Sequence, residues 1–194
     1  VFMSGAKPFR VLSLDGGGMR GSYSAAYLSA LAAGYAKRRK IAQLDVGAAF
    51  DLIVGTSTGA IIGCALAKGI HLSAVINLYQ EHGRAIFRRR LPGGLLGIAV
   101  DLWRRKRALA AGTKALRTVL KKQLGTTTLD EVYEQRRIAL AVTAVEMSQH
   151  RAWVFKTPHL PGEYYRDGGY SLVDVCLATS AAPIYRSLAS VRYP

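Results

Sequence analysis

Two successive units, each an apolar run that leads through glycine into a helical segment, limit the folds open to this chain. The first pairs the apolar run Phe9–Leu14 with a helical segment at about Ser22–Lys40. The second pairs Phe50–Val54 with a helical segment at Ala60–Lys68, which Gly69 closes. Continuous apolar strands that alternate with helices are typical of a parallel sheet covered by helices. We therefore predict an α/β fold.

Strand composition returns in the second half of the chain. Arg137–Val145 and Arg151–Thr157 can pair across a short turn. Ser171–Asp174 resembles a capping box, which predicts a helix that ends before Pro183. Because 50% of the 194 residues are hydrophobic, the chain can bury one sizeable core. We expect a single domain over residues 1–194, truncated at its C-terminus.

Residues 83–122 differ from the rest of the chain in charge. They contain twelve basic residues against the single acid Asp101, and an apolar stretch that ends in Trp103. We predict a basic insertion or cap within the domain. Arg88–Arg90 and Arg104–Arg107 bracket the apolar stretch, which is the layout of a segment that lies on an anionic lipid surface. A pair of solvated helices is an equally supported interpretation.

The net charge of +15 indicates a polyanionic partner, either an anionic membrane surface or nucleic acid. The sequence has no basic sheet with interleaved aromatic residues and no recognised nucleic-acid-binding motif, so the membrane surface is favoured. Cys64 and Cys176 lie in apolar helical segments, which indicates buried free thiols and a reducing, cytoplasmic compartment. No apolar run reaches the ~18 residues that would span a bilayer, so we expect at most peripheral membrane contact.

Gly55–Gly59 reads Gly-Thr-Ser-Thr-Gly and matches the pattern Gly-x-Ser-x-Gly between a predicted strand and a predicted helix. A sharp strand-to-helix turn holds its central residue in strained backbone geometry and requires small neighbours on either side. Ser57 would then lie at a helix N-terminus, where the dipole and free amides favour developing negative charge. We predict that Ser57 is a nucleophile for acyl transfer. The alternative is a serine and threonine turn that only caps the helix.

The glycine cluster Gly16–Gly21 also satisfies Gly-x-Gly-x-x-Gly, the pattern of a dinucleotide-binding turn. Such a site requires an acidic residue near the end of the second strand, and this strand ends in Gly-Thr-Ser-Thr-Gly instead. The consecutive residues Gly16, Gly17 and Gly18 expose their amide hydrogens, which we predict form an oxyanion hole. Arg20 can orient this loop or bind a lipid phosphate, and a surface arginine at the helix start explains it equally well.

With these motifs in this order, the chain resembles the patatin-like phospholipase family. Asp15–Gly21 is similar to the oxyanion loop of that family, Gly55–Gly59 to its nucleophile elbow, and Ala178–Pro183 to a further segment. The resemblance implies a three-layer α/β/α hydrolase fold with a mainly parallel central sheet. It also implies cleavage of fatty acyl esters of phospholipids or neutral lipids by a Ser–Asp dyad, without metal or cofactor. Bacterial members include toxins and nucleotide-gated antiphage effectors, so the resemblance allows a nucleotide regulator.

The general base is the least determined part of this prediction. The aspartate of the family lies in an Asp-Gly-Gly or Asp-Gly-Ala motif, and outside the glycine loop such a triplet occurs at Asp167–Gly169. In the family this motif follows the segment similar to Ala178–Pro183, whereas Asp167 precedes it. Two predictions stay open: the base lies beyond Pro194, which we favour, or it is Asp167. The histidines all precede Asp167, which is the wrong order for a Ser–Asp–His triad.

We therefore predict a serine lipid acyl hydrolase, in which Ser57 forms an acyl-enzyme and the amides of Gly16–Gly18 stabilise the oxyanion. The alternative, from a different class, is a non-catalytic nucleotide- or lipid-binding domain whose glycine loops hold an anion without chemistry. Covalent labelling with a fluorophosphonate separates the two hypotheses, because only the enzyme reacts stoichiometrically at Ser57.

Overall fold

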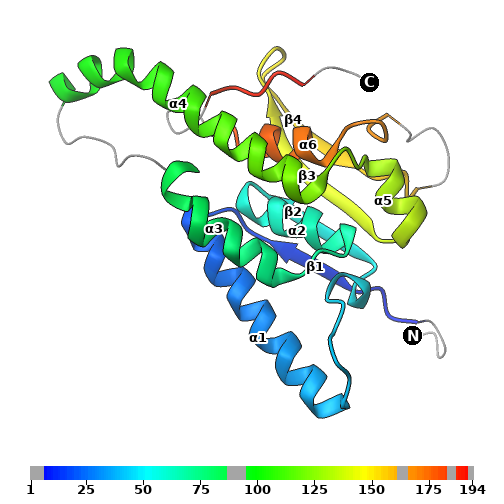
Figure 1. The fold of residues 1–194 in the computed structure, drawn as a ribbon. Helices are drawn as coiled ribbons and strands as arrows, with labels where there is room; N and C mark the ends of the chain where they lie inside the picture. The colour runs from blue at the N-terminus through cyan, green and yellow to red at the C-terminus, as the bar shows by residue number, and fades with distance from the viewer. Residues whose placement is uncertain (1–6, 87–94, 161–165, 183–186, 192–194) are drawn as a thin grey trace.

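The strands form one four-stranded sheet in the order β1-β2-β3-β4. The computed structural model describes residues 7–86, 95–160, 166–182 and 187–191. The strands are β1 (Val11–Leu14), β2 (Leu52–Thr56), β3 (Ala139–Glu146) and β4 (Arg151–Lys156). β1, β2 and β3 are parallel, and β4 pairs antiparallel with β3 as expected from the sequence. The predicted α/β class with a mainly parallel sheet is confirmed (Figure 1).

Helices form most of the connections between these strands. They are α1 (Gly21–Arg39), α2 (Thr58–Lys68), α3 (Leu72–Ile86), α4 (Leu95–Leu124), α5 (Leu129–Arg136) and α6 (Leu172–Thr179). Two short 3-10 turns, η1 (Gly18–Arg20) and η2 (Gly47–Ala49), precede α1 and β2. α1 packs against α3, α3 against α4, and α4 against α6, while α2 lies on the strands (Figure 1).

Residues with capping roles set the ends of several helices. Gly69 closes α2 in the left-handed conformation, with φ 85°, and its amide donates to carbonyl oxygens in the last turn, as predicted. The Ser171 hydroxyl accepts from the Asp174 amide at the start of α6. α5 begins with a capping box in which Thr128 and Glu131 exchange side-chain and backbone hydrogen bonds. α5 was not predicted from the sequence.

The core surrounds α2, in which every residue from Thr58 to Ala67 is buried. Leu14, Ile53 and Leu140 are buried on three neighbouring strands. An added Cβ at Gly63 of α2 would lie 3.1 Å from Ile53 Cγ2, so the helix rests directly on this layer. At Gly59 an added Cβ would overlap the carbonyl oxygen of Leu14. Glycine at these positions therefore lets α2 approach the strands, which places its first residue at the carboxyl edge of the sheet.

The basic segment at residues 83–122 contains the end of α3 and most of α4. Leu116 and Leu120 of α4 are each 1% exposed and belong to the core. The C-terminal part of the segment is therefore a core helix rather than a separate cap. The lipid-surface prediction depends on two basic clusters that the structure does not describe. These are residues Arg88–Arg90 and the side chains of Arg104–Arg107.

Cys64 of α2 and Cys176 of α6 are fully buried free thiols, as predicted. A hydrogen bond with the Cys64 thiol, together with burial, raises the pKa of the Cys176 thiol well above its usual value. The two thiols therefore join α2 to α6 within the core. Among the described residues, no helix has both the length and the apolar character that crossing a membrane requires.

Candidate active site

The turn Gly55–Gly59 joins β2 directly to α2, in the strand–turn–helix context that the motif requires. Ser57 has φ 53° and ψ −120°, a conformation that residues with a side chain rarely adopt and that costs about 1–3 kcal/mol. An added Cβ at Gly55 would lie 2.5 Å from Ala60 Cα, and one at Gly59 would overlap a strand carbonyl. The two glycines therefore allow the sharp turn that carries Ser57.

The Ser57 side chain does not cap the helix that follows it. Ser57 occupies the N-cap position of α2, and its hydroxyl makes no hydrogen bond to an amide of the first turn. A turn that served only as a cap would use this oxygen to satisfy one of those amides. Ser57 is half-buried, and its hydroxyl has no hydrogen-bond partner among the described residues. It lies at the positive end of the helix dipole, which favours negative charge on an attacking oxygen.

The glycine loop Gly16–Gly18 lies against this turn. An added Cβ at Gly16 would be 3.0 Å from Ser57 Cβ, so the loop and the serine are in contact. The Gly17 amide donates to Thr58 Oγ1 at 3.1 Å, and Thr58 is buried. No acceptor among the described residues takes the amides of Gly16 or Gly18. Two of the three predicted oxyanion donors are thus available, while the third fastens the loop to α2.

Arg20 lies in η1, one turn beyond the glycines, and it is exposed. An added Cβ at Gly17 would be 3.2 Å from Arg20 Nε, so the guanidinium group borders the loop. The Arg20 amide donates to the Gly17 carbonyl at 3.1 Å and closes the turn. This position is compatible with the predicted contact to a lipid phosphate, and equally with a role in orienting the loop.

Asp167 is placed away from Ser57. Its carboxylate is 2% exposed and accepts hydrogen bonds from the Lys156 amide at 3.1 Å and from the Arg166 guanidinium at 2.8 Å. The next amide along the chain, that of Thr157, donates to β3, so the Lys156 amide points to the outer edge of β4. With strands ~4.8 Å apart, β3 and β4 separate this carboxylate from the end of β2. The structure does not bring the Asp167 side chain to Ser57.

Thr179 contacts Ser57, although no role was predicted for it from the sequence. The Ser57 amide donates to Thr179 Oγ1 at 2.8 Å, and that hydroxyl donates to the Thr143 carbonyl oxygen at 2.6 Å. The only sequence signal for this contact is that Thr179 falls within Ala178–Pro183, the segment similar to the family. Its partner could not be identified from local pattern, because the two residues are 122 positions apart.

A groove of about 710 Å³ opens beside Ser57 at the carboxyl edge of the sheet. Thr56 and Thr179 form the part of its lining that adjoins Ser57. Most of the remaining lining is apolar and comes from the β3–β4 hairpin, the end of α6 and residues 188–191, with Trp153, Phe155 and Tyr170 as its aromatic members. This volume is within the ~300–1,000 Å³ typical of small-molecule sites, and its lining suits an alkyl chain.

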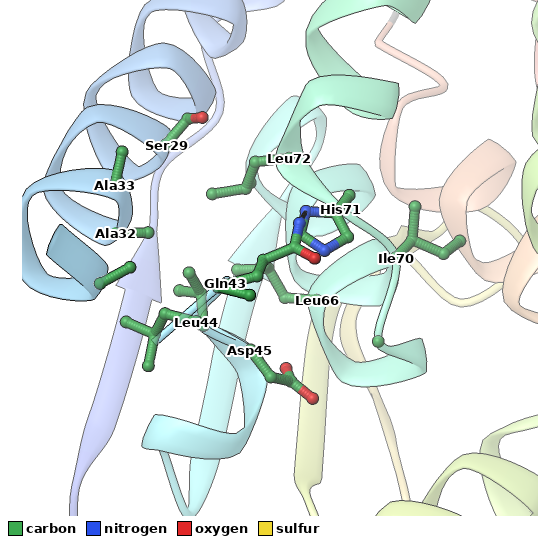
Figure 2. Close-up of a pocket in the computed structure, with 14 residues that line it drawn as sticks. Ser29, Ala32, Ala33, Gln43, Leu44, Asp45, Leu66, Ile70, His71 and Leu72 are labelled. Carbon is green, nitrogen blue, oxygen red and sulfur yellow. Dashed lines mark hydrogen bonds between the residues drawn. The ribbon is translucent and has the colours of Figure 1, made fainter. Parts of the chain in front are cut away.

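A second pocket, of about 410 Å³, lies at the opposite edge of the sheet between α1, residues 42–46 and the start of α3 (Figure 2). Gln43 Nε2 and His71 Nδ1 hydrogen-bond to each other there. Asp45 pairs with Arg136 at 2.5 Å and accepts from the Ala48 amide at 3.2 Å. Within the described residues its lining contains no lysine or arginine. The described lining therefore offers a phosphate no lysine or arginine, and its Gln43, Asp45 and His71 side chains are already paired.

Comparison with known proteins places the chain in a family. The family described as Patatin-like phospholipase matches residues 12–193. A cGAMP-activated phospholipase of Pseudomonas aeruginosa is 36% identical over 188 residues, which are 96% of this chain and 51% of that protein. One of Vibrio cholerae is 33% identical over 180 residues, covering 91% and 48% of the two proteins. Patatin-2-Kuras 4 of Solanum tuberosum is 27% identical over 182 residues, covering 90% and 44%.

The chain spans about half the length of the curated relatives it matches. The matches nevertheless cover at least 90% of this chain, and the family match over residues 12–193 includes the glycine loop, the Ser57 turn and the Thr179 segment. Since the family match also extends over nearly all of its residues, the chain belongs to the patatin-like phospholipase family.

Proposed function

We propose that this chain carries the active site of a serine lipid acyl hydrolase of the phospholipase A type. The observation that supports this most directly is that the Ser57 hydroxyl lies in a strained turn at the N-terminus of α2 and does not cap the helix. The glycine loop and the apolar groove lie on two sides of it. Family membership supports lipase or phospholipase activity in general. A non-catalytic nucleotide- or lipid-binding domain would not require a strained serine whose hydroxyl leaves the helix uncapped.

In the proposed reaction, Ser57 Oγ attacks the acyl carbonyl carbon and the alcohol part of the lipid leaves. Water then hydrolyses the acyl-enzyme. The amides of Gly16 and Gly18 donate to the oxyanion, and one such donor is typically worth about 3 kcal/mol in the transition state. The α2 dipole adds to this stabilisation. The groove beyond Thr56 and Thr179 holds the fatty acyl chain, and Arg20 meets the phosphate of a phospholipid headgroup.

The second member of the dyad is an aspartate that takes the serine proton and later activates water. We propose that this aspartate lies outside residues 1–194, with Asp167 as the alternative. The contacts of Asp167 support this order of preference. Its carboxylate already accepts from Lys156 and Arg166, and it lies beyond the outer edge of β4. A base must come within hydrogen-bond distance of the serine hydroxyl, about 2.6–3.2 Å.

Fluorophosphonate labelling of the intact protein tests the proposal. We expect one adduct per chain, located at Ser57 by mass spectrometry, and none in Ser57→Ala. Ser22→Ala is the matched control, because Ser22 also lies near the glycine loop but donates to the Met19 carbonyl at 2.7 Å. Its labelling should equal that of the parent. An intact protein that binds lipid yet never forms the adduct would favour the binding-domain alternative.

Contact with an anionic membrane surface is a further part of the proposal. It is supported by the net charge of +15 and by the four consecutive basic residues Arg104–Arg107 on α4. Neutralising Arg104, Arg105 and Arg107 should weaken binding to phosphatidylserine-containing vesicles without changing hydrolysis of a short soluble ester. Salt should have the same effect on the parent, since the Debye length falls from ~10 Å at 0.1 M to ~3 Å at 1 M. If neither the arginine substitutions nor high salt weakened vesicle binding, the solvated-helix interpretation would be supported.

Regulation by a cyclic nucleotide is the second candidate property. It is supported by two relatives above 30% identity whose names describe them as cGAMP-activated phospholipases. The described lining of the pocket in Figure 2 contains no lysine or arginine that could bind a phosphate, so we do not assign the nucleotide to that pocket. In the intact protein, cGAMP at 100 times its Kd should stabilise the fold by about 2.7 kcal/mol and increase ester hydrolysis. An unchanged melting temperature at saturating cGAMP would remove this candidate.

A further inference from the structure

One hydroxyl group links three elements at the nucleophile. Thr179 is the last residue of α6, Ser57 stands between β2 and α2, and Thr143 is on β3. Thr179 Oγ1 accepts the Ser57 amide at 2.8 Å and donates to the Thr143 carbonyl at 2.6 Å. The residues that meet here are far apart in the sequence, so the contact exists only in the folded chain.

The Thr179 hydroxyl uses both of its hydrogen-bonding capacities in this link. A threonine hydroxyl has one hydrogen to donate and lone pairs to accept. Because its hydrogen goes to the Thr143 carbonyl, the oxygen is polarised and becomes a better acceptor for the Ser57 amide. A second hydroxyl pair, between Thr56 and Thr143 at 2.7 Å, ties β2 to β3 one residue before the nucleophile. Valine has the shape of threonine but can make neither bond of the link.

The accepted amide belongs to the strained residue itself. Ser57 has φ 53°, and such a conformation persists only when its surroundings hold it. From one side Ser57 is held by Gly16, where an added Cβ would be 3.0 Å from Ser57 Cβ. From the other side the Thr179 hydroxyl fixes the peptide plane that precedes Ser57 Cα. Rotation of that plane would turn the Cα–Cβ bond and move the serine oxygen.

We propose that Thr179 is a positioning residue, which holds the Ser57 backbone in its strained conformation so that the serine oxygen points at the acyl carbon. This inference rests on the proposed function of Ser57 as nucleophile. Thr179 touches the peptide group of Ser57 and not the reacting atoms, so its effect acts on the alignment of attack. Loss of alignment lowers kcat, whereas the groove that binds the acyl chain keeps its shape.

Ser180 provides the matched control within the same turn. Its hydroxyl donates to the Cys176 carbonyl at 2.7 Å, it is 5% exposed, and it makes no hydrogen bond with Ser57 among the described residues. Ser180→Ala therefore removes a buried hydroxyl bond at the end of α6 and leaves the Thr179 link in place. A role for Thr179 that was only structural would make Thr179→Val and Ser180→Ala equivalent.

The kinetic experiment compares three variants of the intact protein on p-nitrophenyl butyrate. Thr179→Val should lower kcat by about 10- to 100-fold with little change in KM, because misplacement of the nucleophile affects the chemical step. Thr179→Ser keeps the hydroxyl and should restore kcat to within about threefold of the parent. Ser180→Ala should keep parental kcat even where its melting temperature falls. Equal kcat in Thr179→Val and Ser180→Ala, or failure of Thr179→Ser to restore activity, would overturn the proposal.

Hydrogen exchange separates failure of this inference from failure of the proposed function, since it requires no activity. The Ser57 amide should exchange faster in Thr179→Val than in the parent, and remain protected in Thr179→Ser and Ser180→Ala. An active parent whose Thr179→Val variant keeps both kcat and amide protection disproves the positioning role alone. If Ser57 takes no fluorophosphonate but Thr179→Val still releases its amide, the backbone link stands and the nucleophile assignment falls.

Discussion

The two ends of α2 lie at opposite edges of the sheet, and the polar groups around them differ in whether they have hydrogen-bond partners. At the carboxyl edge the Ser57 hydroxyl and the amides of Gly16 and Gly18 have no partner within the described residues. At the amino edge, the pocket shown in Figure 2 has two paired polar contacts, Gln43 with His71 and Asp45 with Arg136. A pocket with polar lining is therefore a weaker indication of chemistry than a polar group that folding leaves unpaired.

The backbone shows the same difference. Gly69 at the C-terminal end of α2 has φ 85°, which glycine adopts without steric cost while it caps the helix. Ser57 at the other end has φ 53° and carries a side chain. The strained residue lies beside the glycine-loop amides that have no acceptor among the described residues, whereas the relaxed one lies beside the Gln43–His71 and Asp45–Arg136 pairs. Strain and unpaired polar groups thus coincide at one location.

Removing the unpaired hydroxyl is the strongest test of this difference. Ser57→Ala should reduce ester hydrolysis by ~10⁴-fold or more and leave the melting temperature close to that of the parent, since the hydroxyl caps nothing. His71→Ala removes a paired group at the other edge and should leave turnover unchanged. Kinetics and thermal melts of both variants check this. A Ser57→Ala protein with a tenth of parental activity would rule out the nucleophile assignment.

A methyl group at Gly16 tests the loop side of the carboxyl edge. Gly16→Ala should lower kcat by about 10²-fold, because its Cβ presses on Ser57 and displaces an oxyanion donor. Gly34→Ala on α1 is the control, since its added Cβ has no atom within 4 Å. That variant should keep full activity and gain about 0.5–1 kcal/mol of stability. Parental kcat in Gly16→Ala would mean that this loop does not bind the oxyanion.

Asp167→Asn tests whether a buried carboxylate that is already hydrogen-bonded to Lys156 and Arg166 takes part in the proposed reaction. We expect unchanged kcat per folded molecule and a loss of about 1–3 kcal/mol of stability, because Asn cannot replace the charge-assisted bonds to Arg166. Steady-state kinetics and denaturant unfolding of the intact protein measure the two effects. The reverse result, a large loss of kcat with unchanged stability, would make Ser57 and Asp167 the dyad.

The smallest expected effect concerns Asp130, whose amide donates to the Gly168 carbonyl beside the Asp167 turn. Burial, and then the charge of Glu134, raise the pKa of the Asp130 carboxyl. A raised carboxyl pKa means that the charged form is disfavoured in the folded state, so the parent loses stability as pH rises through this pKa. Asp130→Asn should be slightly more stable than the parent at pH 7, and the gain should vanish below about pH 4. Thermal melts across pH 3–8 test this, and a variant less stable than the parent at pH 7 contradicts it.

The parts of the molecule that could be predicted from sequence are those set by neighbours in the chain. The Gly55–Gly59 turn, the Gly69 cap and the β3–β4 pairing depend on residues a few positions apart, and all three are present in the structure. The capping box of Thr128 and Glu131 is also local, so α5 was within reach of the same reasoning. In α4 the excess of basic residues led to the prediction of an insertion or cap. Leucine and valine residues at its C-terminal end are instead part of the core.

The parts that could not be predicted depend on contacts between distant residues. The bond from the Ser57 amide to Thr179 spans 122 positions, and no local pattern encodes it. The Gly17 amide was expected to be one of three equivalent oxyanion donors, but the buried Thr58 hydroxyl, 41 positions away, accepts it. Burial of Asp167 follows from the packing of its turn against β4. In each case tertiary structure decides which of several equivalent polar groups is left for chemistry.

The buried thiols of Cys64 and Cys176 allow opening of the two helices behind Ser57 to be measured in solution. Both side chains are inaccessible in the native state, and they come from the two helices that carry Ser57 and Thr179 at their ends. An alkylating reagent can modify either thiol only after α2 and α6 separate, and the thiolate is the reactive form. The rate of alkylation under native conditions is therefore a measure of how often this pair of helices opens. Equal rates at the two thiols would mean that the helices open as one cooperative unit.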